Sequence, residues 1–182
     1  MVLAFAGACD DDQTVPPPVE TSGPAPATSS IPGVRPLALC PAIIGAVPAG
    51  LFADPRPVEL ARGTDTTRQS ARNCIVEDRA SGPPRASVLI VMERHAEGVP
   101  YLNQVLTGFM KDGCGPVAAS ADPTGLSRCT TTGRDSAVIG VAALVSGDRY
   151  VGVQVTVYGD NAGNRRKVEE AAPVIARKAL DV

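Results

Sequence analysis

The segment from Ser136 to Gly159, SAVIGVAALVSGDRYVGVQVTVYG, constrains the fold more than any other part of the chain. Two valine-rich runs flank the tetrapeptide Ser146-Gly147-Asp148-Arg149, which has the residue types of a tight turn. Valine favours strands because its branched side chain packs well on a pleated surface. We therefore predict a long antiparallel hairpin, and a sheet built around it.

Further strands precede this hairpin. The segments Arg72–Arg79 and Ala86–His95 are rich in β-branched and apolar residues, and Ala80–Pro84 between them has turn composition. They predict a second hairpin. The segment Leu126–Gly133 is also strand-like, so we expect an antiparallel sheet of about five strands.

Three helices are predicted around the strands. A short one begins just after Cys40, because proline at position 41 is tolerated in a first helical turn. The segment Val99–Gly113 has apolar residues at helical spacing, and a last amphipathic helix starts from a capping Asn164. Pro173 should kink or break that helix because it removes a backbone donor. The fold class is α+β, in the order α-ββ-α-βββ-α, with the three helices packed on one face of the sheet.

Five cysteines indicate the redox environment. Four lie in the body of the chain, and we favour the pairs Cys40 with Cys74 and Cys114 with Cys129 among three possible pairings. No C-x-x-C spacing occurs and the single histidine is distant, so we predict disulfides and neither a metal site nor a cofactor. Disulfides are typical of an oxidising exterior. Cys9 remains for another role.

The start of the chain supplies that role. Ala6-Gly7-Ala8-Cys9 is similar to the lipobox of bacterial lipoproteins, in which small residues precede a cysteine that receives a lipid. We predict residues 1–8 as a residual signal peptide, 9–36 as the lipidated Cys9 with a disordered proline-rich tether, and 37–182 as one α+β domain. The prediction places the domain on the outer face of the cytoplasmic membrane. A frayed terminus with an incidental cysteine is the alternative.

Composition excludes some classes of function. Seventeen basic and nineteen acidic residues give a net charge of −2, and the chain has three Tyr, three Phe and no Trp. This balance offers no positive field for phosphate backbones and little for base stacking, so nucleic acid is not an expected partner. No apolar run is long enough to cross a bilayer as a helix. We expect a monomer.

Catalytic residues are sparse. His95 is the only histidine, and it would need Ser136 as nucleophile with Asp135 or Glu93 to orient it. No G-x-S-x-G elbow exists, and a lone histidine at a strand end is more often an exposed or capping side chain. We therefore predict that the protein is not an enzyme. Glu169 and Glu170 are assigned to the solvated side of the last helix.

Several motifs together resemble a known family. They are a lipobox, a proline-rich linker, LCPAII with a cysteine before a short helix, NCIVED with a cysteine opening a strand, and the late hairpin SGDRYVGVQV. This pattern resembles small lipoproteins of actinobacteria whose domain has no assigned function. Their layout is related to extracellular sensor domains of actinobacterial serine/threonine kinases. The resemblance implies anchoring at the outer face and no known chemistry.

The favoured function is a tethered ligand-binding or sensing module of the cell envelope. Its ligand would be a lipid, a glycan or an envelope protein, held on the sheet face that helices leave uncovered or in a groove beside the helix Val99–Lys111. The alternative is a cell-envelope hydrolase, or its accessory subunit, that uses His95. A third interpretation is a structural spacer without a ligand.

Overall fold

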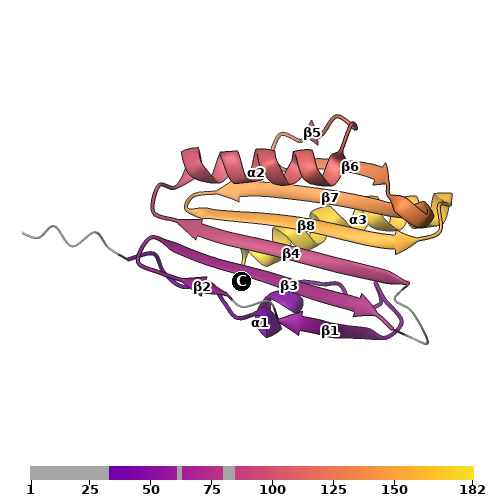
Figure 1. Cartoon of the computed structure of the whole chain (residues 1–182), viewed down its shortest axis with the longest axis horizontal. Helices are drawn as coiled ribbons and strands as arrows, with labels where there is room; N and C mark the ends of the chain where they lie inside the picture. Colours follow the sequence, from indigo (N-terminus) through magenta and orange to yellow (C-terminus); the bar gives the residue numbers. More distant parts are fainter. Residues whose placement is uncertain (1–32, 61–62, 80–84) are drawn as a thin grey trace, which may run out of the picture. The chain divides into compact units, whose positions relative to one another are not determined.

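The computed structural model describes residues 33–60, 63–79 and 85–182 (Figure 1), so the lipobox, Cys9 and nearly all of the predicted tether lie outside the described residues. The helices are α1 (Cys40–Ile44), α2 (Val99–Cys114) and α3 (Ala162–Leu180). The strands are β1 (Pro55–Leu60), β2 (Thr64–Asp65), β3 (Gln69–Asp78), β4 (Ala86–His95), β5 (Ser120–Ala121), β6 (Ser127–Thr132), β7 (Ala137–Ser146) and β8 (Arg149–Tyr158). A 3-10 turn, Arg134–Ser136, links β6 to β7.

The α+β class and the antiparallel sheet are confirmed. The sheet has eight strands in the order β1-β3-β4-β8-β7-β6-β5, with β2 paired to β3 beside this path. The prediction of about five strands missed β1, β2 and β5. Two of these strands have only two residues, and β1 begins with PRP, which does not have the apolar composition of a central strand.

Both predicted hairpins are present. β7 and β8 pair along their full length, and Ser146 lies opposite Arg149. Gly147 has a φ of 58°, which the first central position of a type II′ turn requires. β3 and β4 pair from Gln69 opposite His95 at one end to Asp78 opposite Ala86 at the other. β4 then pairs with β8, and this contact joins the two hairpins into one sheet.

The helices lie on both faces of the sheet, so the prediction that all three pack on one face is wrong. α1 and α3 cover one face, where Ile90, Val153 and Val168 belong to one buried cluster. α2 covers the other face over β7 and β8, where Val141 and Tyr150 belong to a second cluster. Figure 1 shows α2 in front of the sheet and α3 behind it. We call these the α3 face and the α2 face.

The reason lies in β7. Its sequence AVIGVAALV is apolar at both odd and even positions, so both of its faces need cover. Val138, Ala142 and Leu144 point to the α3 face, while Val141 and Ala143 point to the α2 face. An antiparallel strand with one solvated face would alternate with polar residues instead.

α3 runs unbroken from Ala162 to Leu180 with Pro173 inside it, so the proline does not end the helix. Asn161 is its cap, not Asn164: the Asn161 side chain accepts a hydrogen bond from the Asn164 backbone N–H at 2.9 Å. The Asn164 side chain instead donates to the carbonyl of Gly159 at 2.7 Å, which holds the turn after β8. The helix lies close against β7 at Gly140, where an added Cβ would meet the carbonyl oxygen of Val168 at 2.6 Å.

The two favoured disulfides are present. Cys40–Cys74 joins the start of α1 to β3, with its Cα atoms 5.5 Å apart. Cys114–Cys129 joins the end of α2 to β6, with a Cα separation of 6.0 Å. The first described residues already contact the sheet, since the Val34 backbone N–H donates to the carbonyl of Thr67 at 3.1 Å. None of the described helices is long and apolar enough to cross a membrane.

Candidate functional site

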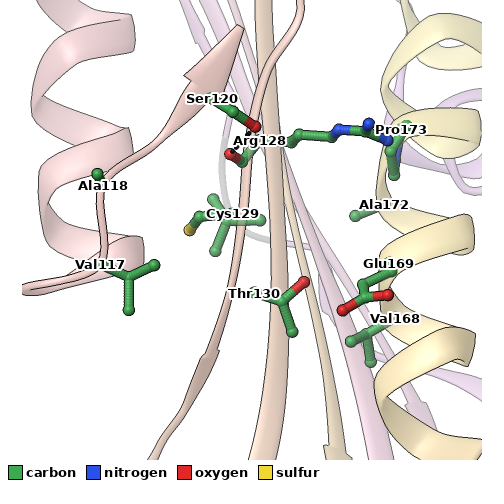
Figure 2. A pocket seen from close by; sticks show the side chains of 11 residues that line it. Val117, Ala118, Ser120, Arg128, Cys129, Thr130, Val168, Glu169, Ala172 and Pro173 are labelled. Carbon is green, nitrogen blue, oxygen red and sulfur yellow. Dashed lines mark hydrogen bonds between the residues drawn. The ribbon is translucent and has the colours of Figure 1, made fainter.

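A pocket of about 350 Å³ lies at the edge of the sheet, between β6 and α3. Its walls come from four segments of the chain: residues 117–120 after α2, residues 128–130 of β6, Val141 of β7, and one stretch of α3 that begins at Val168. Figure 2 shows residues 117 and 118 on one side, α3 on the other, and β6 between them. We call this the α3 pocket.

One wall of the α3 pocket is apolar and rigid. Val168 and Ala172 are 0% and 1% exposed, and Pro173 beside them is also buried. Their position depends on the close approach of α3 to Gly140. Within β6, Cys129 is fixed by its disulfide to Cys114 at the end of α2. This side of the pocket is therefore preformed, as ligand sites usually are.

The remaining lining residues are polar and include both signs of charge. The Arg128 side chain extends from β6 towards Pro173, and Glu169 lies beside Thr130 on the adjacent stretch of α3 (Figure 2). Arg128 and Glu169 are both exposed, and neither belongs to a salt bridge among the residues that the structure describes. A few convergent polar groups beside an apolar wall are typical of a binding site.

A second cavity, of about 280 Å³, lies on the other side of residue 117. Leu106, Met110 and Lys111 of α2 line it together with Ser127 at the start of β6. It corresponds to the groove that was predicted beside the helix Val99–Lys111. It is smaller than the α3 pocket and carries fewer charges, since Lys111 is the one charged side chain among its described lining residues.

Of the uncovered sheet face that was predicted as a second option, only the part over β3 and β4 is free of a described helix, because α2 covers the same face over β7 and β8. No helix lies in front of β3 and β4 in Figure 1. There the α2 face presents half-buried apolar residues such as Ile75 and Leu89, mixed with Gln154 and Thr156 of β8. This surface is flat and strand-built, and it contributes no lining residue to the described pockets.

The structure does not bring the residues of the hydrolase alternative together. His95 lies at the end of β4 opposite Gln69, whereas Ser136 precedes β7 at the other end of the sheet, beyond the pairing of Val138 with Val157. Val157 also pairs with Ala86, the first residue of β4. A ten-residue strand spans roughly 30 Å, which separates the two side chains. Asp135 is next to Ser136 and equally far from His95.

His95 has a structural environment at its own end. Its ring stacks on Tyr101 with centroids 3.8 Å apart, and its Nδ1 accepts the backbone N–H of Glu97 at 3.2 Å. Glu93, which is 8% exposed, accepts a hydrogen bond from Gln69 Nε2 at 2.9 Å. The Glu93 charge raises the pKa of Tyr101. This arrangement matches the capping role expected for a lone histidine at a strand end.

Sequence reasoning did not identify the α3 pocket. It placed Glu169 on the solvated side of α3, where Glu169 is indeed exposed, but it did not connect that residue with Arg128. One signal was present: the strand RCTTT is polar on both faces next to a strand that is apolar on both, which marks β6 as lying near the rim of the sheet. Among the described residues there is no cluster of three or more His, Cys, Asp or Glu that could hold a metal ion.

Comparison with known proteins supports the fold. No family model and no curated protein matches the chain. Among solved structures, the extracellular domain of PknH from Mycobacterium tuberculosis is similar, with a TM-score of 0.51 and 10% sequence identity over 82% of this chain and 100% of that one. The similarity agrees, at the level of fold, with the layout predicted from the sequence. The two disulfides of this chain are typical of proteins from an oxidising, extracytoplasmic compartment.

Proposed function

We propose that this protein is an extracytoplasmic ligand-binding or sensing module and that the α3 pocket holds its ligand. The observation that carries the proposal is the pocket itself, in which a buried apolar wall at Val168 and Ala172 faces Arg128 and Glu169, two opposite charges that lack a salt-bridge partner among the described residues. A lipid, a glycan or a segment of an envelope protein can satisfy such a mixed lining. A structural spacer would not need it.

We further propose that the domain is anchored by a lipid on Cys9. The support is the lipobox-like sequence Ala6-Gly7-Ala8-Cys9 and the seven prolines between residues 10 and 36, which suit a tether. The test is the intact mass of the protein from membranes of its host. We expect cleavage before Cys9, a mass increase for acylation, and release into the soluble fraction on Cys9→Ala. An unmodified leader on soluble protein would refute the anchor.

The proposed mode of action is binding without catalysis. His95 stacks on Tyr101 and accepts a backbone hydrogen bond, and it lies at the opposite end of the sheet from Ser136. We expect His95→Ala to leave the cellular phenotype and ligand binding unchanged. Loss of a phenotype in a variant that melts like the wild type would instead favour the hydrolase alternative.

Native mass spectrometry of protein purified from its host tests the pocket. We expect a co-purifying ligand that is lost from Arg128→Ala, which removes a charge, and from Ala118→Trp, which fills the mouth of the pocket from an exposed position. Lys111→Ala is the matched control, because Lys111 is an exposed cation that lines the second cavity instead. A ligand that survives both pocket variants but leaves with Lys111→Ala would move the site to the second cavity.

A further inference from the structure

β6 is the last long strand on its side of the sheet, and within the described ranges only β5 lies along its outer edge. β7 lies along its inner side. On the outer side β5 contributes only two residues, Ser120 and Ala121, which pair with Arg128 and Ser127. Residues 129–132 of β6 have no strand beyond them in the described part of the chain. The α3 pocket lies along this uncovered stretch, because Cys129 and Thr130 line it.

Hydrogen bonds near the two ends of β6 identify the backbone groups that face outward. The Gly133 N–H donates to the carbonyl of Ala137, at the start of β7, at 2.8 Å. The backbone N–H and carbonyl groups of the odd-numbered residues of β6 are therefore directed to β7. The Asp122 N–H donates to the carbonyl of Leu126 at 3.0 Å, so the even-numbered residues point outward. Thr130 and Thr132 therefore each present an N–H and a carbonyl to the open side.

The pocket provides room for a strand at this edge. Val117 and Ala118 lie on one side of β6 and the helix α3 on the other, so an added strand would have a wall on each side (Figure 2). Side chains of a strand alternate between faces. One set would point to the α3 wall of the pocket, which Val168 and Ala172 line. The other set would contact Val117.

The charges favour a segment with an acidic residue beside Arg128 and no negative charge farther along, where Glu169 lies beside Thr130. Arg128 is two residues before Thr130, so their side chains lie on the same face of β6, and that of Arg128 extends towards α3. The Arg128 side chain would therefore lie beside the first side chain that an added strand directs to α3. An acidic residue there would form a charge-assisted hydrogen bond with the guanidinium. A lipid tail would use the apolar wall but leave the outward N–H and carbonyl groups of Thr130 without a hydrogen-bond partner. The hydroxyls of a glycan can bond to these groups, but only a second strand repeats the regular spacing of the N–H and carbonyl groups along the edge.

We infer that the α3 pocket takes an extended segment of another protein as an added strand on β6, with an acidic side chain against Arg128 and an apolar side chain towards Val168 and Ala172. This inference rests on the proposed function, and it narrows the ligand from three classes to one. The partner is a polypeptide recognised mainly through its backbone, so its sequence requirement is short and alternating.

Selection from a displayed library of random linear peptides, on the folded domain with both disulfides intact, supplies the probe. Thr130→Pro removes one outward N–H without touching the β6–β7 ladder, and proline is tolerated on edge strands. Thr130→Val is the matched control, since it keeps that N–H. We expect Thr130→Pro to lower the affinity for the selected peptides by roughly tenfold or more, and Thr130→Val to change this affinity by less than about threefold. Thermal melting verifies that each variant is folded.

A second measurement uses the unaltered protein. N-methylation of each peptide bond in turn should abolish binding at alternate positions only, because every second N–H of an added strand faces β6. Arg128→Glu should select for a basic residue where the wild type selects an acidic one. These readouts stand even if Thr130→Pro fails to fold.

The outcomes separate the inference from the proposed function. The strand model would be overturned if the peptides bind Thr130→Pro as tightly as the wild type and if N-methylation has no alternating effect on binding along the peptide. The absence of any selected peptide would also overturn it, as would a dimer in analytical ultracentrifugation that Thr130→Pro dissociates, since the edge would then pair with a second copy. If a non-peptide ligand from the host is still lost from Arg128→Ala, the pocket stands and only the peptide inference fails. If Arg128→Ala and Ala118→Trp leave that ligand bound, the proposed function fails as well.

Discussion

Substituting Gly140 by alanine tests how closely α3 is seated on the sheet. An alanine Cβ at this position would lie 2.6 Å from the carbonyl oxygen of Val168 and 2.8 Å from its carbonyl carbon, whereas ordinary contacts begin at 3.4 Å. Both atoms are backbone, so no side-chain rotation relieves the clash. To restore an ordinary contact α3 must move away from β7 by about 0.8 Å, and such overpacking costs roughly 1–3 kcal/mol.

The expected loss is measurable by thermal denaturation with both disulfides oxidised. For a folded domain of this size, a change of 1 kcal/mol shifts the Tm by roughly 2–4 °C, so Gly140→Ala should lower the Tm by roughly 2–12 °C. It should also weaken ligand binding, because Val168 lines the α3 pocket. The free energy of unfolding from urea titration gives the cost independently.

Gly108→Ala is the matched control. Gly108 lies in the middle of α2, and an added Cβ there would meet nothing within 4 Å. The same substitution should then stabilise the protein by roughly 0.5–1 kcal/mol, because alanine loses less conformational freedom in a helix than glycine. A Gly140→Ala variant that melts at or above the wild type would refute the close contact between α3 and β7.

Three further predictions concern other parts of the molecule. Removing the disulfide that closes a 15-residue separation, by Cys114→Ser with Cys129→Ser, should cost about 3 kcal/mol in the chain-entropy model and loosen the α3 pocket, as urea denaturation and the binding assay would show. Tyr150→Phe should leave the free energy of unfolding unchanged or raise it by about 1 kcal/mol, because the buried hydroxyl has no hydrogen-bond partner among the described atoms; a clear loss would mean that it has one. The hydrogen bond from Arg72 lowers the pKa of Asp65, so this carboxylate stabilises the fold above its unfolded pKa of about 4 and that contribution is lost as pH falls through the lower folded value. Denaturation midpoints at neutral and acid pH should therefore differ less in Asp65→Asn than in the wild type.

The sequence predicted local structure well where one signal dominated. The valine-rich arms around Gly147 specify the β7–β8 hairpin, because the turn type and the strand propensity agree within one short segment. The cysteine pairs were also correctly favoured. Each disulfide joins cysteines that are neighbours in the order of cysteines along the chain. The Cα atoms are 5.5 Å apart in Cys40–Cys74 and 6.0 Å apart in Cys114–Cys129.

It failed where two local signals compete or where a choice depends on distant packing. Asn161 and Asn164 are both good caps for α3, and only the turn after β8 decides between them. Pro173 stays inside a helix because tertiary packing buries it. The faces of the helices depend on β7, whose apolar residues at odd and even positions indicated cover on both sides.

The α3 pocket could not be predicted from local patterns. Its walls are contributed by residues near 117, 128, 141 and 170, which come together only in the folded chain. Arg128 and Glu169 each look like ordinary solvated charges in the sequence. Their significance comes from the apolar wall between them, which is a property of the assembled fold.

The Cys40–Cys74 bridge has a mechanical consequence. If the chain is held at its N-terminal end while a partner pulls on the domain, tension enters at residue 40 and passes through two sulfur atoms directly into β3. The segment between the two cysteines, with α1, β1 and β2, bears only the pull that reaches it through hydrogen bonds such as those of Val34 with Thr67 and of Leu37 with Ser70. Reduction of the bridge would place this segment, which spans a sequence separation of 34, in series with the tether. The tether could then lengthen by up to roughly 110 Å as the segment unfolds.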